Sequence, residues 1–261
     1  MNYGSHLHVA REVFPGIPPR LAAEYWLGAM LPDFIHMSGS RIKPRALGRR
    51  RSLTARGIKM HKRTDDVFHN LPGFISLRKE VQDDMTELTV HPRQAQAWAE
   101  VSIEMLMDGV LFQNPKLCTR YQEALSTVKN PSHCHYLAKL AFSGPELPEW
   151  LAAKAELGIP GYLEPSQVVK ALHRRLQFRD KKATATKTGL SFGEDKIVPL
   201  ATILEGKLDQ IRASGPELIG LTIDRLSNPE IRVTTFEPVA PDTIRRRYPR
   251  QTLRPAKRRR K

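Results

Sequence analysis

Apolar residues recur three and four positions apart along most of the chain, which is the spacing of helices that bury one face. Segments containing glycine and proline interrupt this pattern and separate one helix from the next. The pattern predicts helices over residues 5–14, 20–31, 57–69, 74–88, 94–112 and 166–178, broken helical segments across 117–155, and one or two helices over 195–226. We therefore predict an all-α protein.

Three boundaries of these helices follow from local sequence signals. Ser5 is suited to cap the N-terminus of the first helix. Pro32 is disfavoured inside a helix, so we expect the second helix to end there and to leave Asp33 just beyond it, near the interior. Pro216 lies in a Ser-Gly-Pro sequence that should break the last long helix.

The apolar periodicity fades after Asn228, where the sequence becomes rich in proline and arginine. We predict one multi-helix domain over residues 1–228 and an extended or disordered basic tail over 229–261. The segment from Arg245 to Lys261 carries ten basic residues and no acid. It has too few apolar groups to offset the entropy lost on ordering, so we expect it to be disordered. Its charge should attract nucleic acid or another polyanion.

One stretch carries the strongest chemical signal. On a helix, His61, Asp65 and His69 project from one stripe, because each step of four residues nearly completes a turn. Two imidazoles around a carboxylate can supply metal ligands, or ligands plus a catalytic base. The alternative is a solvated polar face, which suits the neighbouring Lys62 and Arg63.

Further candidate ligands lie in apolar surroundings elsewhere in the chain. His6 shares a helix face with apolar residues, whereas His8 points away and is a surface residue or an outer, alternative ligand. Asp108 and Glu104 sit one turn apart within an apolar run, where an unpaired carboxylate would be costly to bury. The triplet His133-Cys134-His135 resembles a ligand cluster, but three partly buried polar residues are the favoured interpretation.

The formal charge of +15 is concentrated in two places. Residues 41–63 carry ten basic residues and no acid, 245–261 carry ten more, and the remainder holds 22 basic and 27 acidic residues. The candidates to contact an anionic substrate or an acidic partner are Arg49, Arg50, Arg51, Lys62 and Arg63.

The location of the protein is suggested by what the sequence lacks. Two cysteines, no membrane span and no secretory leader favour a cytoplasmic protein.

Four segments, in order, resemble motifs of the acyl carrier protein phosphodiesterases, a family related to the HD phosphohydrolases. Met1-Asn-Tyr-Gly-Ser-His-Leu-His-Val-Ala10 is similar to that family's opening, and Leu27-Gly-Ala-Met-Leu-Pro-Asp-Phe34 to its Gly-Asn-Leu-Leu-x-Asp-Phe motif. Gly57-Ile-Lys-Met-His-Lys-Arg-Thr-Asp65 resembles the family's Gly-Ile-x-x-His-Arg-x-Ile-Asp, and Leu106-Met-Asp-Gly-Val-Leu111 its Trp-Asp-His-Phe-Leu. The second segment is also similar to a signature of bacterial zinc-dependent phospholipases C.

The resemblance implies an all-α, HD-like, metal-dependent enzyme that removes 4′-phosphopantetheine from holo acyl carrier protein, an acidic partner. Carried over by position, the metal ligands would be His6, Asp33, His61, Asp65 and Asp108. Manganese is the metal that the resemblance favours, while the ligand types also allow magnesium, iron or zinc. We assign Asp65, His69 and Glu104 as the candidate catalytic residues.

Two departures from the family pattern leave the function open. His69 stands where the family has an aspartate, and Gly109 where it has a histidine. These changes favour an alternative in which a protein of the same fold binds nucleic acid or an acidic partner without catalysis. A phospholipase C-like phosphodiesterase is the other alternative.

Overall fold

Proline and capping side chains open most of the helices. Proline is the first residue of α2 (Pro19–Met37), α4 (Pro72–Glu87), α6 (Pro115–Ser126) and α7 (Pro131–Leu140). Proline is favourable there because backbone N–H groups in the first turn have no hydrogen-bond acceptor within the helix, so the missing N–H costs nothing. Asn130 caps α7 by accepting hydrogen bonds from the backbone N–H groups of Ser132 and His133. The break expected at Asn130-Pro131 is therefore confirmed, whereas Pro145 lies outside the described residues.

The structure is a computed structural model, and it describes residues 2–38, 40–43, 52–88, 92–142, 146–159, 161–182 and 191–228. The remaining α-helices are α1 (Tyr3–Val13), α3 (Leu53–Phe68), α5 (Pro92–Leu111), α8 (Glu146–Leu157), α9 (Pro165–Lys182) and α10 (Ile197–Ser227), with two short 3-10 turns, η2 (Thr127–Lys129) and η3 (Glu194–Lys196). Within the described ranges the only β-type pairing is an isolated bridge between Ile42 and Ala141. The all-α prediction is confirmed.

Three predicted helix boundaries are wrong. Helix α1 begins at Tyr3, so Ser5 lies inside its first turn. Helix α2 continues through Pro32 to Met37, and α10 continues through Pro216 to Ser227. Proline removes one hydrogen bond and bends a helix, but apolar residues on both sides of each proline are buried, and packing outweighs that local cost. Asp33 therefore projects from a helix and not from a loop.

Helices α2 and α3 lie in unusually close contact. A Cβ atom built on Gly28 would lie 2.3 Å from the carbonyl oxygen of Thr54, and one built on Gly57 would lie 2.2 Å from that of Tyr25. Because these obstacles are backbone atoms, only glycine allows the two helices to approach this far. This approach brings Asp33 on α2 next to His61 and Asp65 on α3.

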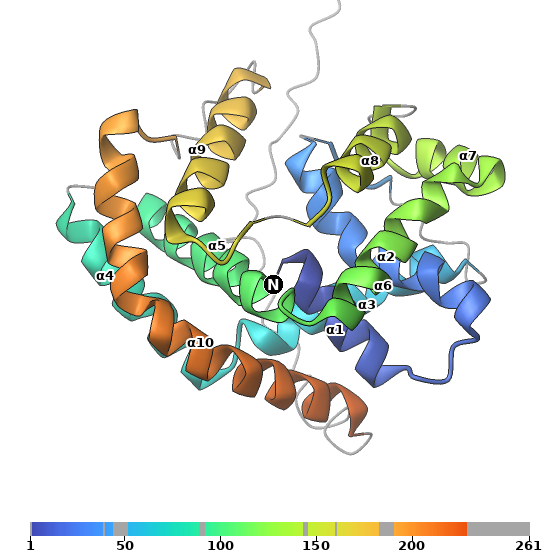
Figure 1. Cartoon of the computed structure of the whole chain (residues 1–261), viewed down its shortest axis with the longest axis horizontal. Coiled ribbons are helices and arrows are strands. Elements are labelled where there is room, and N and C mark those ends of the chain that lie inside the picture. Colours follow the sequence, from blue (N-terminus) through green and yellow to red (C-terminus); the bar gives the residue numbers. More distant parts are fainter. Residues whose placement is uncertain are drawn as a thin grey trace, which may run out of the picture. The chain divides into compact units, whose positions relative to one another are not determined.

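The other helices surround this pair and close the core. Helix α1 packs against α2, α3, α5 and α10, while α5 packs against α4, α9 and α10 (Figure 1). The largest fully buried side chains include Trp98, Tyr25 and Phe34. The core therefore fixes α1, α2, α3 and α5 against one another, and these four helices carry the candidate site.

The described residues up to Ser227 form one compact unit, and Asn228 is the last residue that the structure describes. The predicted basic tail, residues 229–261, and the predicted contacts at Arg49, Arg50 and Arg51 lie outside the described residues. Within the described part of the chain, no helix is both long and apolar enough to cross a membrane.

Candidate metal centre

Four of the predicted ligands converge from three helices. The carboxylate of Asp65 lies between two imidazoles: its Oδ1 is 3.1 Å from Nε2 of His6, and its Oδ2 is 3.2 Å from Nε2 of His61. Asp33 completes the group, with carboxylate oxygens 3.8 Å from Nε2 of His6 and 4.0 Å from Nε2 of His61. We call His6, Asp33, His61 and Asp65 the tetrad.

The tautomer of His61 follows from its partner on α2. Nδ1 of His61 lies 2.8 Å from the carbonyl oxygen of Ala29. A carbonyl oxygen can only accept, so Nδ1–H must donate, and the lone pair of the neutral ring is left on Nε2. That nitrogen faces Asp33 and Asp65, so a proton or a cation is needed between it and the carboxylates. Histidine ligands of metals are oriented by hydrogen bonds of this kind.

The protonation of the tetrad is set by burial and by close charges. Burial lowers the pKa of His6 to about 3, and the His61 ring, stacked 3.7 Å away between centroids, acts in the same direction. Burial also acts to lower the pKa of His61, but the charges of Asp65 and Asp33 outweigh it and raise that pKa. Burial raises the pKa of Asp33 to about 6. The imidazole of His6 is therefore neutral at physiological pH, which is the form that can ligate a metal ion.

Three members of the tetrad, His6, Asp33 and His61, lie close enough together to hold a divalent cation. One ligand atom from each of His6, Asp33 and His61 lies within 4.8 Å of the others, and Asp65 stands between the two imidazoles. Oδ2 of Asp33 is buried and receives no hydrogen bond from the described residues. Imidazole nitrogen with carboxylate oxygen is a donor set that suits manganese, iron or zinc.

A second group of possible ligands lies on α3 and α5. Nε2–H of His69 donates to Oε1 of Glu104 at 2.8 Å, and Glu100 lies one turn before Glu104 on α5. One ligand atom from each of these three residues lies within 4.8 Å of the others. Burial acts to raise the pKa of Glu104, but the hydrogen bond from His69 helps to lower it to about 2, so this carboxylate stays ionised.

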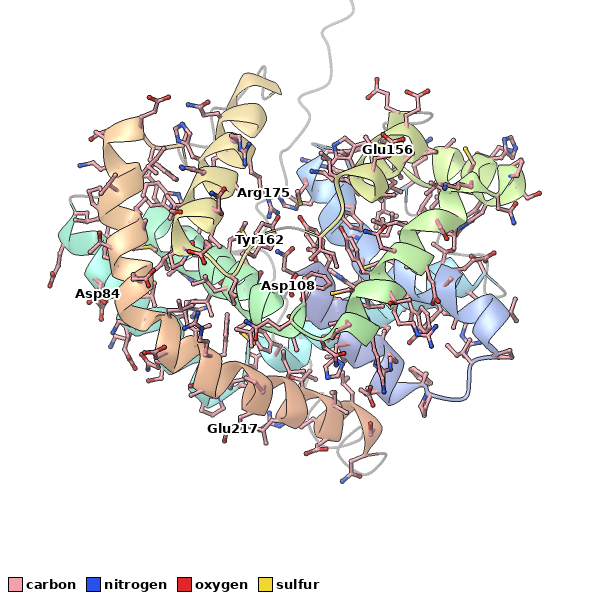
Figure 2. The ribbon with its side chains drawn as sticks, in the orientation of Figure 1. Asp84, Asp108, Glu156, Tyr162, Arg175 and Glu217 are labelled. Atoms are coloured by element: carbon pink, nitrogen blue, oxygen red, sulfur yellow. The ribbon has the colours of Figure 1, made fainter. Side chains whose placement is uncertain are left out.

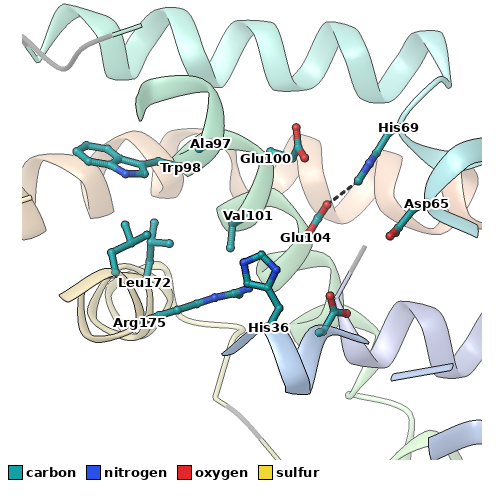
Figure 3. Close-up of a pocket in the computed structure, with 12 residues that line it drawn as sticks. His36, Asp65, His69, Ala97, Trp98, Glu100, Val101, Glu104, Leu172 and Arg175 are labelled. Atoms are coloured by element: carbon teal, nitrogen blue, oxygen red, sulfur yellow. Dashed lines mark hydrogen bonds and ion pairs between the residues drawn. The ribbon is translucent and has the colours of Figure 1, made fainter. Parts of the chain in front are cut away.

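One pocket of about 210 Å³ is lined by all three residues of the second group and by Asp33 and Asp65 of the tetrad (Figure 3). Five carboxylate or imidazole side chains form one end: Asp33, Asp65, His69, Glu100 and Glu104. Apolar side chains from α5 and α9 form the other end, and His36 and Arg175 complete the lining. Figure 3 shows Asp65, His69 and Glu104 directed toward the same space. The three residues that we assigned as catalytic thus line the same pocket as Asp33 of the tetrad.

Asp108, the fifth predicted ligand, binds the start of α1 through its carboxylate and is not part of the tetrad. Its Oδ2 accepts a hydrogen bond from the backbone N–H of Gly4, and its Oδ1 accepts from the backbone N–H and the hydroxyl of Ser5, at 2.7–2.8 Å. Asp108 thus performs for α1 the capping that we expected from Ser5. Burial nevertheless raises the pKa of Asp108 to about 7. Figure 2 shows it near the centre of the view, on α5.

We expect Asp108→Ala to destabilise the fold by about 2–3 kcal/mol, because it leaves two buried N–H groups and a hydroxyl without their acceptor. Asp108→Asn, which keeps one acceptor oxygen, should cost less. Urea unfolding followed by circular dichroism measures both changes. A folded Asp108→Ala protein of unchanged stability that no longer binds metal would instead make Asp108 a ligand.

Packing explains why position 109, one of the departures from the family pattern, is a glycine. A Cβ atom at this position would lie 2.4 Å from the carbonyl carbon of Tyr162 and 2.6 Å from the backbone nitrogen of Leu163. No larger residue fits unless the segment that follows α8 moves away. The histidine that the family carries at this point is therefore excluded by the local packing.

The remaining predicted residues lie apart from the pocket. His8 is half-buried beside Glu12, with Nδ1 3.9 Å from the carboxylate, and Lys62 and Arg63 do not line the pocket. His133 is buried on α7, with Nε2 3.0 Å from the Thr54 hydroxyl, which agrees with a packing role.

Glu100 and Arg175 are pocket residues that sequence reasoning missed. Glu100 lies four residues before Glu104, and Arg175 lies on α9 next to another basic residue, Arg174. The spacing of Glu100 and Glu104 is the one signal that could have indicated a ligand pair.

Comparison of the chain with protein-family models, with curated proteins and with solved structures gave no match. The functional argument therefore rests on the geometry of the pocket and on the motifs of the chain itself.

Proposed function

We propose that the protein is a metal-dependent phosphodiesterase. The observation that carries this proposal is the convergence of His6, Asp33, His61 and Asp65, of which the two carboxylates, Asp33 and Asp65, line a pocket. Such a donor set, open on one side, suits a hydrolytic metal site better than a closed structural one. Cleavage of a phosphodiester, as opposed to another ester, is suggested by the motif resemblance alone.

The tetrad would hold the ion, and the Ala29 carbonyl would keep His61 in the ligating tautomer. A divalent ion in that place supplies an activated water and polarises a phosphoryl oxygen. His69 and Glu104, joined by a 2.8 Å hydrogen bond, line the same pocket and are the groups placed to move a proton toward the departing alcohol. With Glu100 they also offer a position for a second ion.

Substrate, metal and location follow from the motif resemblance and from composition. We propose manganese as the ion and holo acyl carrier protein as the substrate, with hydrolysis releasing 4′-phosphopantetheine. A cytoplasmic location agrees with that substrate and with two free cysteines, Cys118 and Cys134. The basic segments 41–63 and 245–261 would attract the acidic carrier protein or another polyanion.

We expect chelation to abolish hydrolysis of bis-p-nitrophenyl phosphate, lowering the rate at least about 100-fold, since the metal supplies several kcal/mol of transition-state stabilisation. Manganese added back to the chelated protein should restore the rate. The release of p-nitrophenol measures this directly, and metal analysis of the purified protein should find the ion. A rate that is unaffected by chelation would exclude a metal-dependent mechanism.

The natural substrate is tested by incubating the manganese-loaded protein with holo acyl carrier protein and weighing the product. Loss of the 4′-phosphopantetheine mass supports the assignment. Parallel incubation with a phospholipid tests the phospholipase C-like alternative. If only the phospholipid is hydrolysed, the substrate is a phospholipid and not the carrier protein.

A non-catalytic binding protein remains the second candidate, and Gly109 is the observation that favours it. The packing of Tyr162 and Leu163 leaves no room at this position for the side chain that the family carries. Purified protein without metal and without diesterase activity, but with salt-dependent affinity for a polyanion, would support this candidate.

A further inference from the structure

Among the described residues, Arg175 is the one arginine or lysine that lines the pocket. It lies on α9 between Leu172 and Leu176, which line the apolar end. Its side chain extends from α9 toward His36, near the centre of the view in Figure 3. The positive charge thus stands between the apolar end and the acidic end of the pocket.

The charge of Arg175 has no acidic partner within the described part of the chain. No carboxylate there lies within 4.0 Å of its guanidinium, although four carboxylates line the same pocket. By contrast Arg78, on α4, is paired with Glu100 at 3.1 Å. A half-buried guanidinium without a counter-ion is costly, so a ligand anion is the natural complement.

The apolar end indicates what accompanies that anion. Ala97, Trp98 and Val101 on α5 face Leu172 and Leu176 on α9 across the pocket. These side chains offer no charge and almost no hydrogen bonding, so they suit an uncharged organic chain. A phosphodiester placed with its phosphorus toward the tetrad would lie with one ester chain along them.

We infer that Arg175 binds the ionised non-bridging oxygen of the substrate phosphodiester, and that the apolar end binds the uncharged chain of one ester group. Guanidinium suits this task because its planar N–H groups can meet two oxygens at once. The inference rests on the proposed function for the bond that is cleaved, but anion binding by Arg175 does not require cleavage.

Arg174 provides a matched control, since it is the neighbouring residue on α9 and is exposed, away from the pocket lining. We expect Arg175→Met to weaken binding of inorganic phosphate to the manganese-loaded full chain at least about tenfold by calorimetry, and to raise KM for bis-p-nitrophenyl phosphate by a similar factor. Arg175→Lys should recover part of both. Arg174→Met should stay within twofold of wild type.

The outcomes separate this inference from the proposed function. Phosphate affinity that is the same in wild type and Arg175→Met, or lost equally in Arg174→Met, overturns the anion site even if diesters are cleaved. An affinity that depends on Arg175 supports it even if no diester is cleaved, in which case the proposed function fails alone.

The apolar end is tested with alkyl p-nitrophenyl phosphodiesters from methyl to butyl. Each added methylene should lower KM, or the inhibition constant if no cleavage occurs, by up to about fourfold as it leaves water. Val101→Thr, which keeps the shape of a half-buried pocket residue, should flatten this dependence. Equal constants across the wild-type series would overturn the assignment of the apolar end.

Discussion

Asp65→Asn is expected to lower kcat/KM for a phosphodiester about 1,000-fold, equivalent to about 4 kcal/mol of transition-state stabilisation. Asp65 is the centre of the tetrad, with one oxygen 3.1 Å from His6 and the other 3.2 Å from His61. Asparagine keeps the size but removes the charge and replaces one oxygen by an NH2 group, which cannot ligate a cation. The ion, and the water that it activates, should be lost together.

His61→Ala should have the same effect for a related reason. It removes the Nε2 donor, whose lone pair is directed at Asp33 and Asp65 by the hydrogen bond to Ala29. Because His61 is buried, this variant also leaves a cavity, so its folding must be measured separately. Metal content and rate should fall while the helical circular-dichroism signal remains.

Asp66→Asn is the matched control, because Asp66 is the next residue on α3 and is exposed to solvent. It removes the same charge from the same helix, and we expect its rate to stay within about twofold of wild type. If Asp66→Asn lowers the rate as much as Asp65→Asn, the rate depends on the total charge of α3 and not on the place of Asp65 in the tetrad. Full metal content and full activity in Asp65→Asn would remove Asp65 from the site.

The second large effect concerns Gly57. Alanine is the better helix former by about 1 kcal/mol, so propensity alone predicts that Gly57→Ala stabilises α3. The added Cβ would instead lie 2.2 Å from the Tyr25 carbonyl oxygen and 2.7 Å from the Ala29 nitrogen. Both are backbone atoms, so one helix must move, and we expect a net loss of about 3 kcal/mol or more.

The displacement should also reach the metal site. Ala29 supplies the carbonyl that orients His61, and Asp33 follows one turn later on the same helix. Moving α2 away from α3 therefore separates the ligands of two helices, and the metal affinity of any folded Gly57→Ala protein should fall. Thermal unfolding and a metal titration measure the two effects.

Gly206→Ala tests the same substitution without the obstacle. Gly206 lies within α10, and a Cβ there would meet nothing within 4 Å. We expect stabilisation by about 0.5–1 kcal/mol, from propensity and from the lower entropy of the unfolded chain. If both glycine substitutions stabilise the protein, the close approach of α2 and α3 is not required.

The sequence by itself determined the helical class and most of the tetrad's positions. Apolar spacing of three and four residues depends only on helix geometry, so it located the helices without knowledge of their partners. The same geometry placed His61 and Asp65 on one stripe of α3 and turned His6 inward on α1, where it is buried. These are properties of single helices, and the neighbouring residues suffice to set them.

Only the tertiary structure decided which helices face one another and which polar groups were already satisfied. Helix α2 passes through Pro32 because burial on both sides outweighs the lost hydrogen bond, and this sets the direction of Asp33. Asp108 turned out to cap α1 from more than 100 residues away. Arg175 reaches the pocket from α9, far along the chain from the tetrad. Local periodicity cannot predict such contacts, because they depend on how separate helices pack, and that packing is allowed here by glycines at positions 28 and 57.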